Sequence, residues 1–223
     1  MVIEMNGLPG SGKSYFVERA VAALKENEIY AENMAVTEKK MIWMVVQKIQ
    51  SVLLLHRACK DKELLRLREK YRNRKARYAV TISFDSYLKR LLYLTEYYKY
   101  LQSKQKRYLF DEGIYQVMTA MAVDFDMESK ELLYLWKRIK ENDRDVISIW
   151  YHIEIETCMD SLKKRNRQVC DIDRLKEEKL REMLKKYEAV FQFFETYGCE
   201  FLHMNRKDCT EGKIRSLIER TEL

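Results

Sequence analysis

The sequence predicts an α/β protein with three layers (α/β/α), in which helices cover both faces of a five-stranded parallel sheet and a helical insert interrupts the alternation. Three observations support this prediction. Short apolar runs alternate with long amphipathic stretches along the 223 residues, which is typical of a covered parallel sheet. A glycine-rich turn directly follows the first apolar run. Only one proline and six glycines punctuate the chain, so long helices are expected to dominate.

The predicted strands are the short apolar runs at 2–5, 28–31, 108–110, 146–155 and 199–204. The fourth run is nearly continuous in apolar and β-prone residues, so we expect it to be central and covered on both faces. His152 lies within it. We interpret this residue as a core histidine and not as a catalyst.

Three helices are expected from periodicity. The first follows the glycine-rich turn and places Phe16, Ala20, Ala23 and Leu24 on one face. A second is expected to begin at Thr157 and to end at 163–165. A third spans 173–197 and stops at Gly198. Its apolar face comprises Leu180, Met183, Leu184, Tyr187, Phe191 and Phe194.

Residues 37–105, between the second and third strands, form the predicted helical insert, a cap of two or three helices over one end of the sheet. The apolar stretch 41–55 contains Gln47 and Lys48 and is too short and too polar to cross a bilayer, so we expect a buried or partly buried helix. The β-prone segment 78–82 is included in the helix that follows it. Residues 1–223 are predicted to form a single domain.

Residues 7–14 have the sequence GLPGSGKS, which matches the phosphate-binding loop (P-loop) of nucleoside-triphosphate enzymes. Gly7, Gly10 and Gly12 permit backbone conformations in which the N–H groups around Ser11 point at phosphate oxygens. Lys13 is expected to contact the β- and γ-phosphates, and the Ser14 hydroxyl to ligate Mg²⁺. The fold is therefore predicted to be that of a P-loop NTPase that binds ATP or GTP with Mg²⁺.

The third predicted strand ends in YLFDEG, residues 108–113. A carboxylate at this point can hold Mg²⁺ directly or through water, and we assign that role to Asp111. Glu112 is the candidate general base. It would accept a proton from an acceptor hydroxyl in a kinase, or orient water in an ATPase. A phosphate acceptor would instead favour a cation here.

A basic segment, SLKKRNR at 161–167, follows the fourth strand. Arg165 and Arg167 could neutralise charge during phosphoryl transfer from a lid at about 163–173. The alternative is that a helix C-terminus simply prefers positive charge.

These segments resemble the P-loop nucleoside and nucleotide kinases, particularly the thymidylate kinase-like group. The resemblance covers residues 1–32 and 107–223 and rests on GLPGSGKS, LFDEG, ISIWYHIEIETCMDSLKKRNR, FFETYG and EFLHMN. It implies that Arg165 and Arg167 are lid arginines and that Asn205 and Arg206 lie near the adenine. Thymidylate kinases have Asp-Arg and deoxynucleoside kinases Glu-Arg where this chain has Asp111-Glu112, a difference that argues against a nucleoside monophosphate acceptor.

The composition, 47% hydrophobic and 35% charged, indicates a cytoplasmic enzyme without a signal peptide or a membrane span. The net charge of +7 favours polyanionic partners. We interpret the basic stretch 66–77 as a solvated helix face in preference to a nucleic-acid site. The cysteines show no metal-ligand spacing and are interpreted as free thiols: Cys59, Cys158, Cys170, Cys199 and Cys209.

Together these features predict an ATP- and Mg²⁺-dependent phosphotransferase, a P-loop kinase that acts on a small-molecule acceptor. One alternative is a P-loop ATPase or nucleotide-dependent switch with a protein or nucleic-acid partner, in which Glu112 orients water. Another is a polynucleotide 5′-hydroxyl kinase or RNA-binding protein that uses the basic stretch near Arg72. Whether the chain forms a homodimer stays open.

Overall fold

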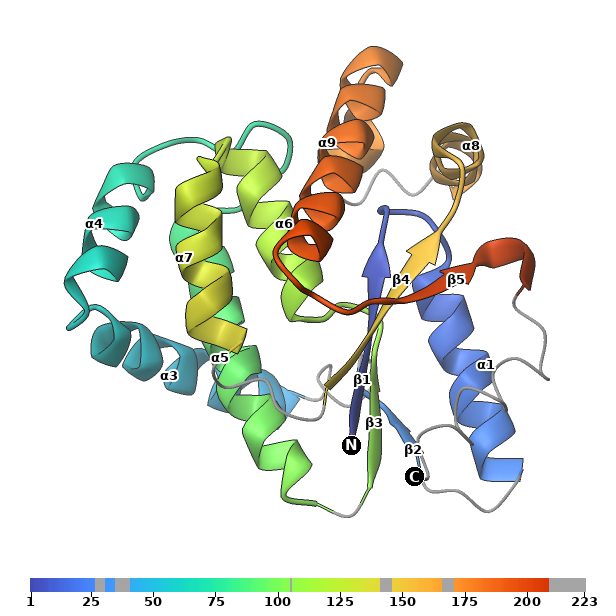
Figure 1. Ribbon diagram of the computed structural model, residues 1–223, viewed down its shortest axis with the longest axis horizontal. Coiled ribbons are helices and arrows are strands. Elements are labelled where there is room, and N and C mark those ends of the chain that lie inside the picture. Colours follow the sequence, from blue (N-terminus) through green and yellow to red (C-terminus); the bar gives the residue numbers. More distant parts are fainter. Residues whose placement is uncertain (27–30, 35–40, 105, 141–145, 166–170, 209–223) are drawn as a thin grey trace.

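The computed structural model describes residues 1–26, 31–34, 41–104, 106–140, 146–165 and 171–208. Within these residues one sheet contains five parallel strands in the order β2-β3-β1-β4-β5 (Figure 1). The predicted five-stranded parallel sheet is therefore confirmed. Its strands are β1 (Val2–Gly7), β2 (Ala31–Asn33), β3 (Arg107–Phe110), β4 (Val146–His152) and β5 (Leu202–Asn205).

β1 pairs with β4 from Val2↔Val146 to Gly7↔Tyr151. Because of this pairing, β1 continues to Gly7, two residues beyond the predicted strand 2–5. β4 is buried at residues 148–151 and lies between β1 and β5, as predicted. It ends before 155, because helix α8 (Ile155–Arg165) begins there, two residues ahead of the predicted start.

The two edge strands are also shifted from their predicted positions. β5 begins at Leu202 and not at 199. β2 extends to Asn33, and residues 28–30 of the predicted strand lie outside the described residues. Edge strands pair on one side only, so their limits depend more on the neighbouring strand than on local apolar character.

Helix α1 (Lys13–Glu26) covers one face of the sheet. Phe16, Ala20 and Leu24 are buried there against β1, β3, β4 and β5, whereas Ala23 is only partly buried. The predicted helix and its apolar face are confirmed, since residues spaced by four lie on one side of a helix.

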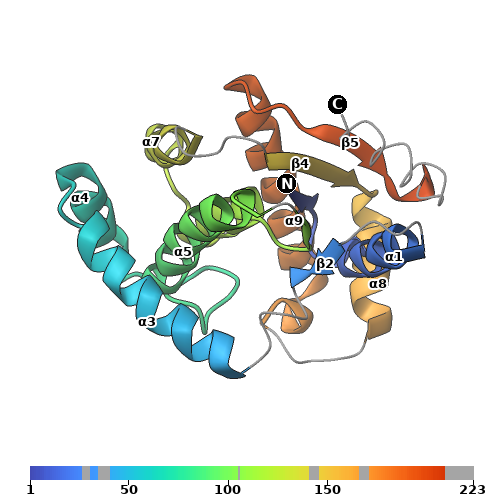
Figure 2. The same ribbon diagram turned by 90° about the horizontal axis from the view of Figure 1, so that it is seen from below.

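The opposite face is covered by α5 (Phe84–Gln102), α6 (Ile114–Phe125), α7 (Ser129–Lys140) and α9 (Glu177–Thr196). Figure 2 shows α5 and α7 on the side of the sheet away from α1. The six residues predicted for the apolar face of α9 are all buried. This helix begins at Glu177 and not at 173, because Asp171–Arg174 form a 3₁₀ helix. The predicted three-layer architecture is confirmed.

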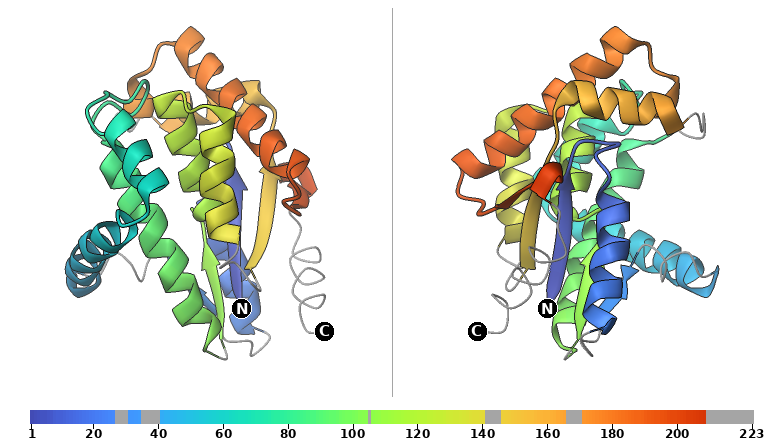
Figure 3. Two further views of the ribbon diagram at one scale, coloured as in Figure 1. Left: turned by 60° about the vertical axis from the view of Figure 1, so that its left-hand side comes forward. Right: turned by 90° about the vertical axis from the view of Figure 1, so that its right-hand side faces the viewer.

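Residues 41–102 of the insert contain three helices, α3 (Met41–Ala58), α4 (Lys62–Tyr71) and α5. Leu55 and Ala58 of α3 are buried, as expected of a partly buried helix. Figure 3 shows α3 projecting from the rest of the molecule. Its outer face exposes more than half of each of four apolar side chains, Val45, Ile49, Val52 and Leu53.

The prediction that 78–82 belongs to the following helix is wrong. α5 begins at Phe84, and the Ser83 side chain caps it by accepting a hydrogen bond from the backbone N–H of Ser86. The backbone N–H groups of Tyr78 and Ala79 donate instead to the side chain of Asp124. A distant carboxylate therefore holds this segment in a loop, which local propensity could not indicate.

Three basic side chains in the stretch 66–77 form ion pairs within the protein. Arg68 pairs with Asp85, Lys70 with Glu128 and Glu131, and Arg77 with Glu182.

None of the helices in the described ranges combines the length and apolar character needed to cross a bilayer. Among the described residues, Cys59, Cys158 and Cys199 are not part of a disulfide. Cys170 and Cys209 lie outside the described residues.

Candidate functional site

The phosphate-binding loop, residues 7–14, joins β1 to α1 at the edge of the sheet where β4 also ends (Figure 1). Helix α8 packs against the outside of this loop. The Cys158 thiol donates to the carbonyl oxygen of Pro9 over 2.7 Å. Gly10 has φ of +86°, and a Cβ there would lie 2.6 Å from Cγ of Leu162. Glycine at this position therefore allows both the turn and the close approach of α8.

The donors of the loop are arranged to receive an anion. Lys13 is 8% exposed, and its ammonium donates to the carbonyl oxygens of Gly7 and Leu8 at 3.1 and 3.0 Å. In the described part of the chain, the backbone N–H groups of Gly10 and Gly12 have no acceptor. The Ser11 hydroxyl is buried without a partner. These unsatisfied donors beside a lysine fit a phosphate group.

Ser14 and Asp111 meet at the N-terminus of α1. The Ser14 hydroxyl donates to Oδ2 of Asp111 over 2.6 Å. The two residues are brought together because β1, which precedes the loop, pairs with β3, which precedes Asp111. A hydroxyl and a carboxylate oxygen are ligands that Mg²⁺ accepts, so this pair fits the predicted metal.

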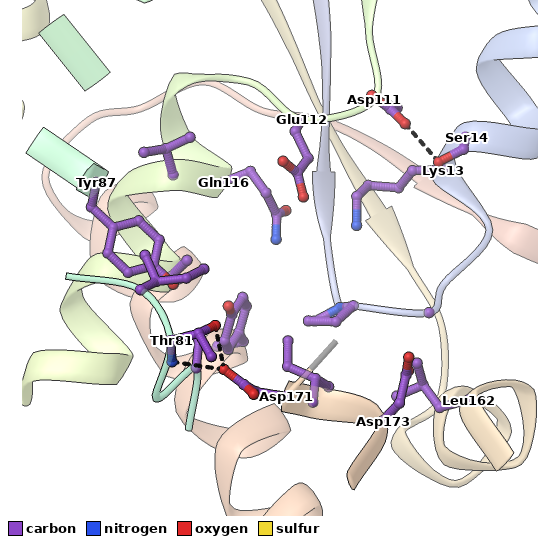
Figure 4. Close-up of a pocket in the computed structure, with 18 of the residues that line it drawn as sticks. Lys13, Ser14, Thr81, Tyr87, Asp111, Glu112, Gln116, Leu162, Asp171 and Asp173 are labelled. Carbon is purple, nitrogen blue, oxygen red and sulfur yellow. Dashed lines mark hydrogen bonds between the residues drawn. The ribbon is translucent and has the colours of Figure 1, made fainter. Parts of the chain in front are cut away.

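Glu112 follows Asp111 and is exposed. Figure 4 shows its carboxylate directed into the same cavity as Lys13 and Gln116. The cavity has a volume of about 750 Å³ and lies between the phosphate loop and the insert. It is large enough for a small molecule beside the phosphates.

Part of the cavity wall was not predicted from the sequence. Ala79 and Ile82 contribute apolar surface from the insert, and Val117 and Ala120 from α6. The polar lining includes five residues that sequence reasoning missed as site residues: Thr81, Tyr87, Gln116, Asp171 and Tyr187. Of these residues, Gln116 alone could have been suspected from the sequence, because it follows the candidate base Glu112 by four residues, a spacing that can place two side chains on one side of a helix.

Asp124 holds two parts of the cavity wall, the segment at Tyr78 and Ala79 and the side chain of Tyr87, by hydrogen bonds. Its Oδ1 accepts the backbone N–H groups of Tyr78 and Ala79, both at 3.0 Å. Its Oδ2 accepts the Tyr87 hydroxyl over 2.6 Å. Burial, with the nearby charges of Asp124 and Glu112, raises the pKa of Tyr187 well above its usual value. The Tyr187 phenol therefore stays protonated at neutral pH.

Thr81 and Asp171 bridge two segments that line the cavity (Figure 4). The backbone N–H and the hydroxyl of Thr81 both donate to Oδ2 of Asp171, at 2.8 and 2.7 Å. These bonds lower the pKa of Asp171 below its usual value. The loop of the insert is thus joined to the 3₁₀ helix that precedes α9.

Glu4 lies in β1 and was assigned no role from the sequence. It is fully buried, and its carboxylate accepts hydrogen bonds from four groups. The donors are Asn6 Nδ2, Ser148 Oγ, Tyr98 Oη and the backbone N–H of Ile114, at 3.1, 2.9, 3.0 and 2.7 Å. Burial raises the pKa of Glu4 above its usual 4.5, and the hydrogen bonds oppose this shift.

Of the three predicted arginines, the structure describes Arg165 and Arg206 but not Arg167. Arg165 is the last residue of α8, and Arg167 lies outside the described residues, as does 166–170 of the predicted lid. Arg206 follows β5, and its Nη1 donates to the Ser161 hydroxyl over 3.1 Å. Its Nε lies 4.0 Å from the position that a Cβ on Gly12 would take. Arg206 is therefore beside the phosphate loop, next to Asn205 at the end of β5.

His152 is half-buried, in contrast to the predicted core position. β4 ends at this residue, so its side chain reaches the edge of the sheet. Its Nε2 lies 2.7 Å from Nδ1 of His203, whose Nε2 lies 2.7 Å from Oε1 of Glu195. Burial, together with His203, lowers the pKa of His152. The residue does not line the 750 Å³ cavity.

The fold resembles solved structures of a nucleoside kinase. One is deoxyadenosine kinase from M. mycoides with bound dATP, with a TM-score of 0.55, 16% identity and 100% of each chain covered. Another is the same enzyme with the products dCMP and a flexible dCDP, with a TM-score of 0.52, 16% identity and coverage of 99% of this chain and 98% of that chain. No family model matches the sequence, and a comparison with curated proteins finds no match. The chain has a P-loop kinase-like fold, as the resemblance in its sequence predicted.

Proposed function

We propose that this protein is an ATP- and Mg²⁺-dependent kinase that phosphorylates the hydroxyl group of a small, uncharged acceptor of the nucleoside class. The observation that carries this proposal is the convergence of the phosphate loop, Asp111 and Glu112 on one cavity of about 750 Å³. The two similar structures, with bound dATP and with the product dCMP, support the same class of reaction.

The phosphate loop would hold the triphosphate of the donor nucleotide. Lys13 would exchange its bonds to the Gly7 and Leu8 carbonyls for phosphate oxygens, which are stronger partners because they are charged. Ser14 and Asp111 would hold Mg²⁺. When bound, this ion would neutralise charge on the phosphate oxygens. Arg206 lies where it could contact the nucleotide, and Arg165 and Arg167 stay predicted contributors of positive charge.

Glu112 would serve as the general base. Its carboxylate would accept the proton of the acceptor hydroxyl as the hydroxyl oxygen bonds to the γ-phosphorus. The bond from that phosphorus to the bridging oxygen breaks, and the nucleoside diphosphate leaves with that oxygen. Most of the acceleration would come from positioning, because phosphoryl transfer needs little covalent help from the protein.

The charges at the acceptor end favour an uncharged acceptor. Glu112, Asp171 and Asp173 line the cavity, where the basic residues among the described lining residues are Lys13 and Arg174. A second phosphate group would face this acidic set. The aromatic and apolar wall near Tyr187 would suit a flat, neutral ring.

Label transfer from γ-labelled ATP tests the proposal. The purified protein would be incubated with Mg²⁺ and a panel of nucleosides, nucleoside monophosphates and sugars. We expect a labelled monophosphate from at least one nucleoside, and a fall in kcat of about a hundredfold for Glu112→Gln. Glu178→Gln, at an exposed position on α9, is the matched control.

Two outcomes would replace this function with another. Release of labelled inorganic phosphate without any acceptor, abolished by Glu112→Gln, would indicate an ATPase or a nucleotide-dependent switch. Transfer only to the 5′ end of an oligonucleotide, reduced by Arg72→Ala, would indicate a polynucleotide kinase. The cytoplasmic location and the homodimer considered from the sequence stay predictions.

A further inference from the structure

Gln116 connects the phosphate loop to the cavity. It lies in the first turn of α6, is 5% exposed and is part of the cavity lining. Its Oε1 accepts the backbone N–H of Gly7 over 3.0 Å. A single buried side chain therefore contacts the residue at which β1 enters the phosphate loop and the space where an acceptor would lie.

The bond to Gly7 determines the orientation of the amide. A backbone N–H can only donate, so the oxygen of the Gln116 amide must face Gly7 and the nitrogen must face the opposite way. Figure 4 shows this nitrogen directed into the cavity. In the described part of the chain, no group accepts a hydrogen bond from it. Gln116 thus presents a hydrogen-bond donor, and no acceptor, to whatever occupies the cavity.

Because this nitrogen faces the cavity, a ligand that supplies an acceptor there gains a hydrogen bond that a ligand without one lacks. Val117 and Ala120, which line the cavity from the same helix, have apolar side chains and offer it no acceptor. Glu112 lies four residues earlier, and its carboxylate is directed into the same cavity (Figure 4). The donor nitrogen and the proposed base therefore offer complementary contacts to one molecule.

We infer that Gln116 is a specificity-determining residue that donates a hydrogen bond to an oxygen or ring nitrogen of the acceptor nucleoside, while its carbonyl holds Gly7 in the phosphate loop. This inference rests on the proposed function, because it takes the cavity as the acceptor site. It also makes Gln116 a direct link between the two substrates. A ligand with only donor groups at this position would be rejected, since two donors would face each other.

Two substitutions separate the two contacts of this side chain. Gln116→Glu keeps an oxygen for the Gly7 N–H and replaces the donor nitrogen with an acceptor of the same size. Gln116→Leu removes both contacts. Gln192→Glu, at an exposed position on α9, repeats the charge change away from the cavity and serves as the control.

Calorimetry would measure the dissociation constants of the four deoxyribonucleosides and, separately, of Mg-ATP. For Gln116→Glu we expect at least a tenfold weaker affinity for the nucleoside that the wild-type protein binds best, and a change of less than about twofold for Mg-ATP. Gln116→Leu is expected to weaken both. The control variant should match the wild-type protein in both titrations.

The inference and the proposed function can fail separately. Equal affinity of the wild-type protein and Gln116→Glu for nucleosides would overturn the inference, as would a parallel loss of affinity for nucleoside and Mg-ATP, which indicates a purely structural role. Absence of nucleoside binding to the wild-type protein would also overturn it. If nucleosides bind through Gln116 but receive no labelled phosphate, the inference stands and the kinase function falls.

Discussion

The carboxylate of Glu4, in the middle of β1, accepts a hydrogen bond over 2.7 Å from the backbone N–H of Ile114, the first residue of α6. The N-cap residue of this helix is Gly113, which has no side chain to accept such a bond. A residue of a neighbouring strand therefore caps α6 from a distance. A Cβ on Gly113 would lie 2.0 Å from Oε2 of Glu4. Glycine at 113 therefore allows the Glu4 carboxylate to approach the turn that follows Asp111 and Glu112.

Glu4→Gln tests this remote cap. The amide nitrogen of glutamine would take the place of one carboxylate oxygen, so its N–H groups would face groups that donate to that oxygen in the wild-type protein. We therefore expect the free energy of unfolding to fall by about 1–3 kcal/mol. Urea denaturation would measure it. Glu178→Gln, at an exposed position, should leave stability unchanged within about 0.5 kcal/mol. Equal stability of Glu4→Gln and the wild-type protein would contradict the capping role.

The same variant should change the pH dependence of stability. Burial raises the pKa of Glu4 above 4.5, so between these two values the folded state holds a proton that the unfolded state has lost. The wild-type free energy of unfolding therefore contains a contribution that falls as pH rises through this window. Glu4→Gln lacks it, so the stability difference between the two proteins should be larger near pH 4.5 than at neutral pH. A constant difference would count against the raised pKa.

Lys13→Ala should strongly weaken nucleotide binding without unfolding the protein. Lys13 donates to two carbonyl oxygens of its own loop, but its main partner in the proposed function is the phosphate. We expect the affinity for Mg-ATP to fall by roughly a hundredfold, as loss of a charge-assisted contact predicts. Calorimetry would measure this. Lys25→Ala, near the other end of α1, is the control and should bind normally.

Asp111→Asn should alter the magnesium requirement. The amide oxygen can still accept the Ser14 hydroxyl, which lies 2.6 Å from the carboxylate, but the negative charge that attracts the ion is lost. We expect the Mg²⁺ concentration for half-maximal activity to rise about tenfold. Asp126→Asn changes an exposed carboxylate at the far end of α6 and should have no such effect. An unchanged requirement would remove Asp111 from the metal site.

Tyr87→Phe should weaken acceptor binding more than nucleotide binding. The substitution removes the hydroxyl that donates to Asp124 over 2.6 Å and keeps the ring. We expect a loss of stability of about 0.5–1.5 kcal/mol and a higher KM for the acceptor, because the cavity wall is less firmly held. Thermal unfolding and steady-state kinetics would show this. Tyr100→Phe, on the exposed side of α5, is the control.

Much of the phosphate site could be predicted, because its residues are close in sequence. Lys13 and Ser14 follow the glycines directly, and their roles depend on a loop whose geometry is local. Asp111 was predicted because a phosphate-loop enzyme needs an acid at the end of an apolar strand, where it can hold Mg²⁺ directly or through water. The structure brings its carboxylate to Ser14 although 97 residues separate them.

The acceptor side of the cavity could not be predicted in the same way. Thr81 and Asp171 are 90 residues apart, and Tyr87 and Asp124 are 37 apart. No periodic pattern connects such pairs. The segment 78–82 was assigned to a helix for the same reason, since the carboxylate of Asp124 that holds it belongs to a different element.

By itself, the sequence determined that this chain has a phosphate-binding loop, a parallel sheet and a carboxylate at the end of the third strand. These properties follow from side-chain periodicity and from backbone conformations that only certain residues adopt. The tertiary structure alone decided which way the amide of Gln116 points, how Glu4 caps α6 and what lines the cavity. Those features depend on hydrogen bonds between distant residues, and only the packing of helices against the sheet brings their partners within reach.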